Sequence, residues 1–258
     1  MYKLGMIEKS IYNERKKHPL VIPQIDPDNY TTNFESWLEN IKKLNLNLIA
    51  IGGSTVDAFS TQNILDVAIR KYNLNVIIYI SSNPSAIIGV KDKTALYWGQ
   101  IPGAQNTFYG WDGLIANSLN INKNNIEPLP TVYVFDDRGT IGTANWVSRS
   151  ISVPREKPGI SLAIAKAAEY LGMRFYIMAG GSGSKTPPPL KHIELLSKRT
   201  NLFIIPTSGI NNKESADQIF ASGADAIHLG SILEKENGFE ILKDILEVSK
   251  KYPGKDYD

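Results

Sequence analysis

Short runs of apolar residues, many of them β-branched, recur along the whole chain and are separated by amphipathic stretches. Several runs are apolar almost throughout, which is typical of strands covered on both faces of a parallel sheet. The runs that we predict as strands are residues 20–25, 46–51, 75–80, 94–98, 131–135, 174–178, 202–206 and 225–229.

The stretches between these strands carry apolar residues at helical spacing. We predict helices over residues 33–44, 63–72, 159–171, 190–199 and 214–221. A short opening helix is also predicted, because Leu4, Ile7 and Ile11 repeat at the same spacing before His18-Pro19. This alternation of strands and helices favours an α/β fold with parallel strands.

The number of strands selects the architecture. Eight strands in 258 residues match a (β/α)8 barrel in number and in size. A doubly wound sheet usually has fewer strands and carries a glycine fingerprint after the first one, whereas the first strand here runs into Ile25-Asp26-Pro27-Asp28. Since the chain shows no linker and no repeat beyond the alternation, we predict one TIM-like barrel domain over residues 1–258.

Two connections are longer than usual, at residues 99–130 and 136–158. The first is rich in Gly, Asn and aromatic residues. In the second, Asp137-Arg138-Gly139 predicts a turn between two short strands. Long loops in a compact domain are often functional, so each connection is interpreted either as a functional loop or as an irregular surface insertion.

Composition narrows the class of protein. Lys and Arg total 28 against 26 Asp and Glu, and this near balance offers no electrostatic footprint for nucleic acid. The absence of cysteine excludes disulfides, thiolate metal sites and cysteine nucleophiles. No run approaches the roughly 20 apolar residues that span a bilayer, and the N-terminus lacks the apolar core of a signal peptide. We therefore expect a soluble, cytoplasmic protein.

Glycine- and serine-rich segments follow the last three predicted strands. These segments are residues 179–184 (AGGSGS), 207–210 (TSGI) and 230–231 (GS). In a TIM barrel the active site lies at the carboxyl ends of the strands. A phosphate needs several convergent backbone N–H donors, and glycine lets the main chain approach it closely. A single such loop fits an ordinary tight turn, but three in consecutive units predict a phosphate site.

Asp26 and Ser54 follow the first and second predicted strands. Their oxygen atoms are hard ligands, which Mg²⁺ accepts while it keeps water and substrate phosphate oxygens in its shell. We therefore predict that Asp26 and Ser54 bind Mg²⁺. Capping of the next helix is the competing role for Asp26, and it is the expected role of Asp28.

The three histidines support no serine-hydrolase triad. His18 precedes the first strand, at the end of the barrel away from the predicted site. His192 is expected to be exposed on a helix. His228 lies inside the eighth strand and is expected in the core.

Together these segments resemble the geranylgeranylglyceryl phosphate synthase family, which includes bacterial prenylglyceryl phosphate synthases. The matching segments, in order and at the right strand ends, are residues 25–28 (IDPD), 51–55 (IGGST), 175–183 (FYIMAGGSG), 208–210 (SGI) and 223–231 (GADAIHLGS). The resemblance implies a Mg²⁺-dependent barrel enzyme that transfers a geranylgeranyl group from its diphosphate to the 3-hydroxyl of sn-glycerol 1-phosphate. This reaction forms the first ether bond of archaeal membrane phospholipids.

The resemblance also implies roles for individual residues. Asp26 and Ser54 would hold Mg²⁺ at the prenyl diphosphate, and Asp26 and Tyr176 would be catalytic. The residues implied for glycerol 1-phosphate binding are Tyr176, Gly180, Gly181, Ser182, Gly183, Ser208, Gly209, Gly230 and Ser231. An apolar groove for the prenyl chain is a hypothesis for the aromatic residues of the first long connection, with packing in the core or at the surface as the expected role of any single one. These residues are Trp98, Phe108, Tyr109 and Trp111.

The chain departs from the family pattern at Met178. Most members have a glutamate there that contacts the glycerol hydroxyls, and a thioether cannot replace a carboxylate as an acceptor. Asp136 and Asp137 are candidates for supplying the missing contact.

Two other classes of protein stay open. The same loops suit a barrel that binds FMN or a phosphorylated sugar, as an isomerase or an oxidoreductase does. The third class is a barrel that binds a phosphorylated metabolite without turnover, and the missing glutamate at Met178 keeps this alternative open. The length of the prenyl chain and the oligomeric state, monomer or homo-oligomer, are not determined by the sequence.

Overall fold

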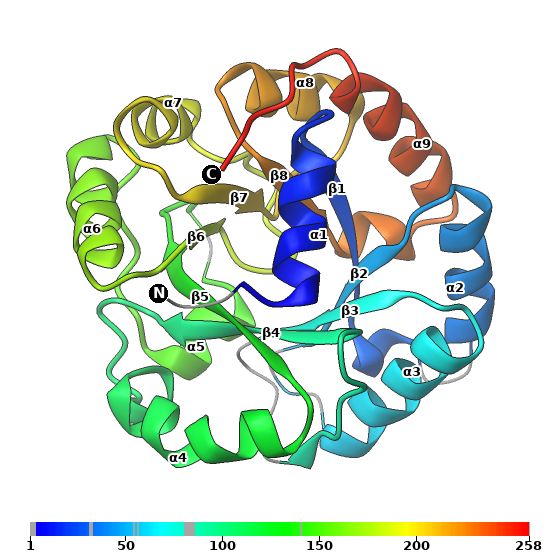
Figure 1. Cartoon of the computed structure of the whole chain (residues 1–258). Helices are drawn as coiled ribbons and strands as arrows, with labels where there is room; N and C mark the ends of the chain where they lie inside the picture. Colours follow the sequence, from blue (N-terminus) through cyan, green and yellow to red (C-terminus); the bar gives the residue numbers. More distant parts are fainter. Residues whose placement is uncertain are drawn as a thin grey trace.

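The computed structural model describes residues 4–30, 33–53, 55, 57–79, 86–139 and 141–257, and its parallel strands close into a barrel (Figure 1). Each strand pairs with the next along the chain, and β8 pairs with β1 to complete the ring. The predicted (β/α)8 barrel is confirmed. The strands are β1 Leu20–Ile25, β2 Leu48–Ile51, β3 Asn75–Ile78, β4 Thr94–Gln100, β5 Glu127–Phe135, β6 Phe175–Ala179, β7 Phe203–Thr207 and β8 Ala226–Leu229.

Helices surround the barrel, and each predicted helix overlaps an observed one (Figure 1). The α-helices are α1 Met6–Arg15, α2 Phe34–Lys43, α3 Ala58–Arg70, α4 Trp111–Lys123, α5 Thr143–Ser148, α6 Pro158–Tyr170, α7 Leu190–Arg199, α8 Lys213–Ala221 and α9 Gly238–Ser249. Short 3-10 helices occur at η1 Pro27–Asn29, η3 Thr107–Tyr109 and η4 Ser231–Glu234. Within the described ranges, none of the helices has the length and apolar character needed to cross a bilayer.

The two long connections are more regular than their sequences predict. α4 lies inside residues 99–130, and α5 lies inside residues 136–158. The α4 segment contains one glycine and several asparagines, which are weak helix formers, so its helix depends on the tertiary structure around it. Asn117 contributes a local hydrogen bond of 2.9 Å from its side-chain amide to the carbonyl of Gly113.

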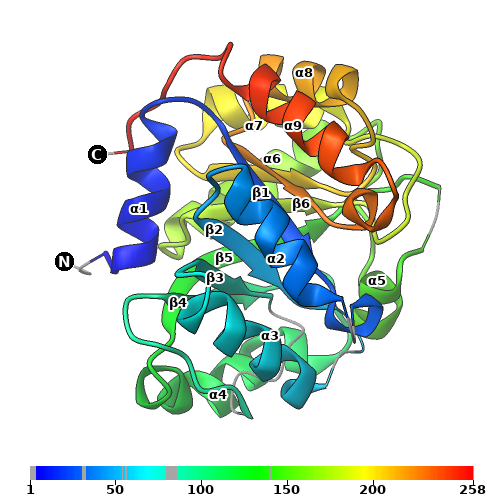
Figure 2. The same cartoon turned by 90° about the vertical axis from the view of Figure 1, so that its right-hand side faces the viewer.

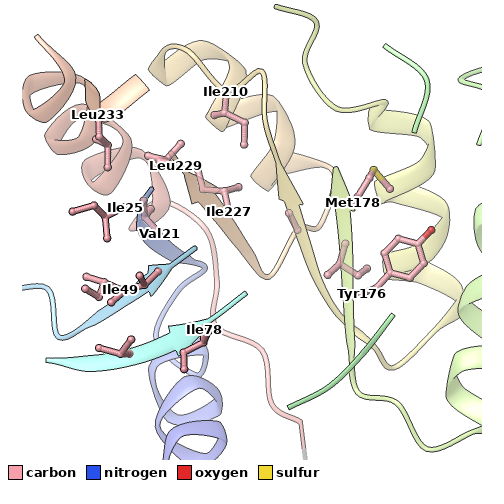
Figure 3. Packing of buried hydrophobic residues seen from close by; sticks show 14 of the residues in the cluster. Val21, Ile25, Ile49, Ile78, Tyr176, Met178, Ile210, Ile227, Leu229 and Leu233 are labelled. Atoms are coloured by element: carbon pink, nitrogen blue, oxygen red, sulfur yellow. The ribbon is translucent and has the colours of Figure 1, made fainter. Parts of the chain in front are cut away.

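Alternation along each strand sorts the side chains into two apolar layers. One layer fills the barrel interior, and the other packs between the sheet and the helices. In β6, Phe175 and Ile177 belong to the interior layer, whereas Tyr176 and Met178 belong to the outer one. Figure 3 shows Tyr176 and Met178 together on the helix-facing side of their strand.

Helix α1 lies across the end of the barrel where the strands begin (Figures 1 and 2). The carboxylate of Glu127 accepts hydrogen bonds of 2.9 Å from the N–H groups of Ile7 and Glu8, which satisfies free donors in the first turn of the helix. At the other end of α1, the buried side chains of Arg15 and Asp225 form an ion pair of 3.1 Å. Helix α1 therefore closes the end of the barrel interior at which the strands begin.

Candidate active site at the carboxyl end of the barrel

A pocket opens at the carboxyl ends of the strands, and its lining changes around the ring. The half that follows β6, β7, β8, β1 and β2 is polar and includes Gly181, Ser182, Ser208, Gly230, Ser231 and Asp26. The half that belongs to β3, β4 and β5 and the segments after them is largely apolar and includes Tyr79, Ile101, Tyr109, Tyr133, Phe135 and Ala144. We call these the polar half and the apolar half. A ligand with one polar and one hydrocarbon part matches this division.

The polar half contains five of the residues predicted to bind phosphate: Gly181, Ser182, Ser208, Gly230 and Ser231. Within the ranges that the structure describes, the backbone N–H groups of these five residues donate to no protein acceptor. Ser208 has a left-handed backbone conformation, with φ of 67°, which is uncommon for a residue other than glycine. Unpaired N–H groups that line one pocket provide the donors that an anion requires.

The other three predicted loop residues do not line the pocket. Gly180 lies against Arg138, and a Cβ atom at position 180 would approach Cδ of Arg138 to 2.2 Å. Gly209 lies against the carbonyl oxygen of Thr186, which a Cβ atom would approach to 2.1 Å. Close packing of the loops therefore explains these two glycines. Gly183 faces open space.

Asp26 lies directly after β1, at the edge of the polar half. Its Oδ1 accepts a hydrogen bond of 3.2 Å from the N–H of Asp28, so the cap of η1 is Asp26 and the prediction that Asp28 is the cap is wrong. The carboxylate of Asp28 instead accepts a hydrogen bond of 2.9 Å from the hydroxyl of Thr55. Burial raises the pKa of Asp26, and the nearby carboxylates of Asp28 and Glu234 add to that effect. A bound cation would oppose both effects.

The second predicted metal ligand, Ser54, lies outside the described residues, so its role stays a prediction. Its neighbour Gly53 packs so closely on Asp26 that a Cβ atom would lie 2.3 Å from Oδ1 of the carboxylate. No group of three or more His, Asp or Glu side chains that could hold a metal is found among the described residues. A Mg²⁺ ion at Asp26 would therefore take most of its ligands from water and from substrate phosphates, as Mg²⁺ commonly does.

Tyr176 does not lie where the resemblance implies. Its side chain is fully buried between β6 and the helices, it does not line the pocket, and its hydroxyl is one of two buried side-chain polar atoms without a partner in the described structure. The period of two along a strand sends Tyr176 and Met178 outward because Ile177 points into the barrel. The expectation that Tyr176 contacts substrate is therefore at odds with its position.

The two candidates for replacing the family glutamate are also absent from the pocket lining. Asp136 is buried and forms a bidentate pair with Arg138, with 2.6 Å between Oδ1 and Nε and 2.8 Å between Oδ2 and Nη2. Asp137 is exposed and accepts a hydrogen bond of 2.9 Å from the N–H of Gly139. A bend forms at residues 137–139, but in the described part of the chain it leads into α5 and not into a second strand, and Asp136 forms a parallel bridge to Val153.

A hydrogen-bonded chain of aromatic residues lies beneath the pocket. His228 is buried, as predicted, with Nδ1 2.8 Å from the hydroxyl of Tyr79 and Nε2 2.8 Å from the hydroxyl of Tyr97. Burial lowers the pKa of His228 to about 3, so the imidazole is neutral at physiological pH. Tyr79 lines the pocket but was missed by the sequence analysis, because it continues an apolar run that is typical of core.

Other aromatic and histidine predictions have mixed outcomes. Of the four aromatic residues considered for the prenyl groove, Tyr109 lines the pocket. Trp98 and Trp111 line a separate groove on the outside of the barrel, beside α4. The prediction that His192 is exposed is wrong: it is fully buried, with Nδ1 2.8 Å from the hydroxyl of Ser161 and Nε2 2.9 Å from the carbonyl of Arg155.

The fold and the pocket define a TIM barrel whose mouth combines unpaired backbone donors with an aromatic wall. The sequence model of the PcrB family matches residues 10–249 of this chain. The chain therefore belongs to the PcrB family.

Curated relatives match almost the whole chain. The geranylgeranylglyceryl phosphate synthase of Pyrococcus furiosus is 29% identical over 247 residues, which cover 95% of this chain and 96% of that protein. The geranylgeranylglyceryl phosphate synthase of Methanosphaera stadtmanae is 30% identical over 245 residues, or 94% of this chain and 98% of that protein.

Among solved structures, the (S)-3-O-geranylgeranylglyceryl phosphate synthase of Thermoplasma acidophilum, in complex with its substrate sn-glycerol-1-phosphate, has the same fold. It aligns with a TM-score of 0.84 at 23% identity, over 97% of this chain and 100% of that chain.

Proposed function

We propose that this protein is a prenyltransferase that joins geranylgeranyl diphosphate to the 3-hydroxyl of sn-glycerol 1-phosphate, giving geranylgeranylglyceryl phosphate and diphosphate. The observation that carries the proposal is the division of the pocket into a polar and an apolar half, in a chain whose relatives are named for this product. One substrate is a small phosphate ester and the other joins a diphosphate to a long hydrocarbon.

The polar half supports binding of the phosphate of the acceptor. Its five N–H groups at Gly181, Ser182, Ser208, Gly230 and Ser231 have no acceptor within the described structure, so an anion can take them without displacing a protein partner. The hydroxyls of the three serines add further donors. We assign these residues to glycerol 1-phosphate, with Gly180, Gly183 and Gly209 shaping the loops around them.

The apolar half supports binding of the first carbons of the prenyl group. Four of its side chains are each at most 8% exposed: Ile101, Tyr109, Tyr133 and Phe135. An isoprene unit placed among them is therefore removed from contact with water. Each buried CH₂ group contributes about 0.8 kcal/mol. The pocket is thus able to bring the allylic carbon C1 close to the polar half, where the acceptor hydroxyl would lie.

Asp26 and Ser54 are the residues that we assign to Mg²⁺. The fit rests on Asp26, a half-buried carboxylate whose pKa is raised by burial and by acidic neighbours, and whose oxygen atoms suit a hard cation. When bound, Mg²⁺ would neutralise the charge that develops on the departing diphosphate.

The transfer forms one C–O bond, breaks another and releases a proton. The oxygen of the 3-hydroxyl forms a bond to C1 of the prenyl group, the bond from C1 to the diphosphate oxygen breaks, and the hydroxyl proton leaves to diphosphate or water. An allylic C1 is electrophilic once the leaving group is stabilised, so a strong nucleophile is not required. The contribution of this chain is to orient both substrates and to exclude water with the aromatic wall.

Replacement of Ser208 by Trp tests the assignment of the two halves. The indole would fill the turn after β7, so we expect the KM for glycerol 1-phosphate to rise by about tenfold or more while the KM for geranylgeranyl diphosphate stays within about twofold. Selective loss for the prenyl substrate would show that the phosphate site has been placed on the wrong side of the pocket.

A further inference from the structure

Arg138 is a buried cation behind the wall of the pocket, and its contacts converge on the turn after β7. Its Nε and Nη2 pair with the carboxylate of Asp136. The third guanidinium nitrogen, Nη1, donates to the carbonyl of Thr207 at 3.0 Å and to that of Ser208 at 2.6 Å, and it lies 3.5 Å from the carbonyl of Thr186. Arg138 does not line the pocket itself.

These contacts decide which way two successive peptide units face. In a trans peptide, the carbonyl of one residue and the N–H of the next point in opposite directions. Since the carbonyls of Thr207 and Ser208 point to Arg138, the N–H groups of Ser208 and Gly209 point away from it. Neither of these N–H groups finds a protein acceptor in the part of the chain that the structure describes.

The backbone of this turn is strained in a way that calls for an external restraint. Ser208 and Gly209 both have positive φ, 67° and 68°. A left-handed conformation is costly for serine and persists where the surroundings enforce it. The two carbonyl contacts of Arg138, on either side of the Ser208 backbone, supply such a restraint.

We propose that Arg138 is a positioning residue for the phosphate site. It draws the carbonyls of Thr207 and Ser208 away from the bound anion and keeps the N–H of Ser208, which lines the pocket, available to phosphate oxygens. A carbonyl oxygen facing the pocket would repel the same ligand. The inference rests on the proposed function, because it takes the phosphate of the acceptor as the anion that binds at this turn.

The role depends on the planar fork of arginine. Asp136 fixes the plane of the guanidinium through two hydrogen bonds, and this leaves Nη1 aimed at the turn. A lysine ammonium has no fork and cannot bind the carboxylate on one edge and two carbonyls on the other. Arg138→Lys therefore keeps the charge and removes the restraint.

Calorimetric titration with inorganic phosphate and with glycerol 1-phosphate tests the proposal. For Arg138→Lys, we expect both dissociation constants to rise by about tenfold or more and the KM for prenyl diphosphate to stay within about twofold. The matched control is Arg155→Lys. Arg155 donates to the carbonyl of Pro187 at 3.0 Å, in the segment after β6, without contacting the turn after β7, so its variant should bind phosphate like the wild type.

The outcomes separate this role from the proposed function. If the wild type binds no phosphate, the phosphate site itself is refuted and the role of Arg138 with it. If the wild type binds phosphate and a folded Arg138→Lys variant binds it equally well, the role of Arg138 alone is overturned. A parallel rise of both KM values with a lower melting temperature would indicate general structural support and would also overturn it.

An NMR measurement on the wild type covers the case in which the variant does not fold. Addition of inorganic phosphate should shift the backbone amide resonance of Ser208. An unshifted Ser208 resonance at saturating phosphate would contradict the proposal.

Discussion

The hydroxyl of Tyr79 lies 2.8 Å from Nδ1 of His228, at the floor of the pocket. A neutral imidazole has one N–H and one acceptor nitrogen. Tyr97 is fully buried, and its hydroxyl lies 2.8 Å from the other ring nitrogen, Nε2. The buried hydroxyl proton of Tyr97 finds an acceptor when it is donated to Nε2. His228 then donates from Nδ1 to Tyr79. Because its oxygen accepts from His228, Tyr79 keeps its own O–H as a donor at the pocket that it lines, and the chain ends there.

Replacement of Tyr79 by Phe removes this donor and keeps the aromatic ring. We expect kcat/KM to fall by about tenfold, which is the size of one lost hydrogen bond to a substrate oxygen, with little change in melting temperature. Steady-state kinetics and thermal unfolding measure both quantities. Tyr97→Phe is the matched control: it removes the far end of the chain, so its effect on kcat/KM should be clearly smaller. Equal losses in both variants would argue that the chain only supports the fold.

The buried histidine predicts a dependence of stability on pH. Burial lowers the pKa of His228 from 6.5 to about 3, so the unfolded chain binds a proton between these pH values that the folded chain does not. The contribution of neutral His228 to the free energy of unfolding is therefore fully present above about pH 6.5 and is lost as the pH falls toward 3. In denaturant titrations at several pH values, His228→Gln should make the free energy of unfolding depend less steeply on pH. The decrease in slope should correspond to at most one bound proton. An unchanged slope would mean that His228 is protonated in the folded state.

Asp26 is predicted to matter for turnover and not for folding. Asp26→Asn keeps the size of the side chain but removes the charge assigned to Mg²⁺, so we expect at least about a hundredfold loss of kcat and a higher Mg²⁺ requirement. The matched control is Asp28→Asn, because Asp28 follows in the same turn but bonds Thr55. Its kcat should stay within about threefold. Full activity of Asp26→Asn would remove Asp26 from the metal site.

The ion pair between Arg15 and Asp225 is predicted to stabilise the closed end of the barrel. Both side chains are buried, and Asp225 also accepts a hydrogen bond of 2.8 Å from the N–H of Ile204. Asp225→Asn leaves a buried cation without its partner, so the free energy of unfolding should fall by about 3–5 kcal/mol. Glu14→Gln, which breaks the exposed pair with Lys17, should change it by less than about 1 kcal/mol. Similar values for the two variants would contradict the role given to burial.

Local pattern predicted the barrel because each strand is a continuous apolar run followed by turn residues. The same rule located Gly181, Ser182, Ser208, Gly230 and Ser231, since the carboxyl ends of parallel strands meet at one end of the barrel.

Features that depend on tertiary contacts were not accessible in this way. The local sequence places His192 at the surface, whereas the partners that bury it, Ser161 and the carbonyl of Arg155, are more than 30 positions away. Arg138 followed two aspartates and preceded a glycine, which is typical of an exposed turn, and its carbonyl partners come from β7 and the residue after it. Tyr176 was assigned through a resemblance, and the direction of its side chain is set by the alternation along β6.

The most direct test of the proposed function is product formation from labelled sn-glycerol 1-phosphate, geranylgeranyl diphosphate and Mg²⁺, with sn-glycerol 3-phosphate as the control acceptor. The proposed function predicts an organic-extractable product from the 1-phosphate, little or none from the 3-phosphate, and turnover despite Met178. Absence of extractable product from either acceptor, with folded protein that binds glycerol 1-phosphate, would contradict prenyl transfer and leave a phosphate-binding barrel with another activity.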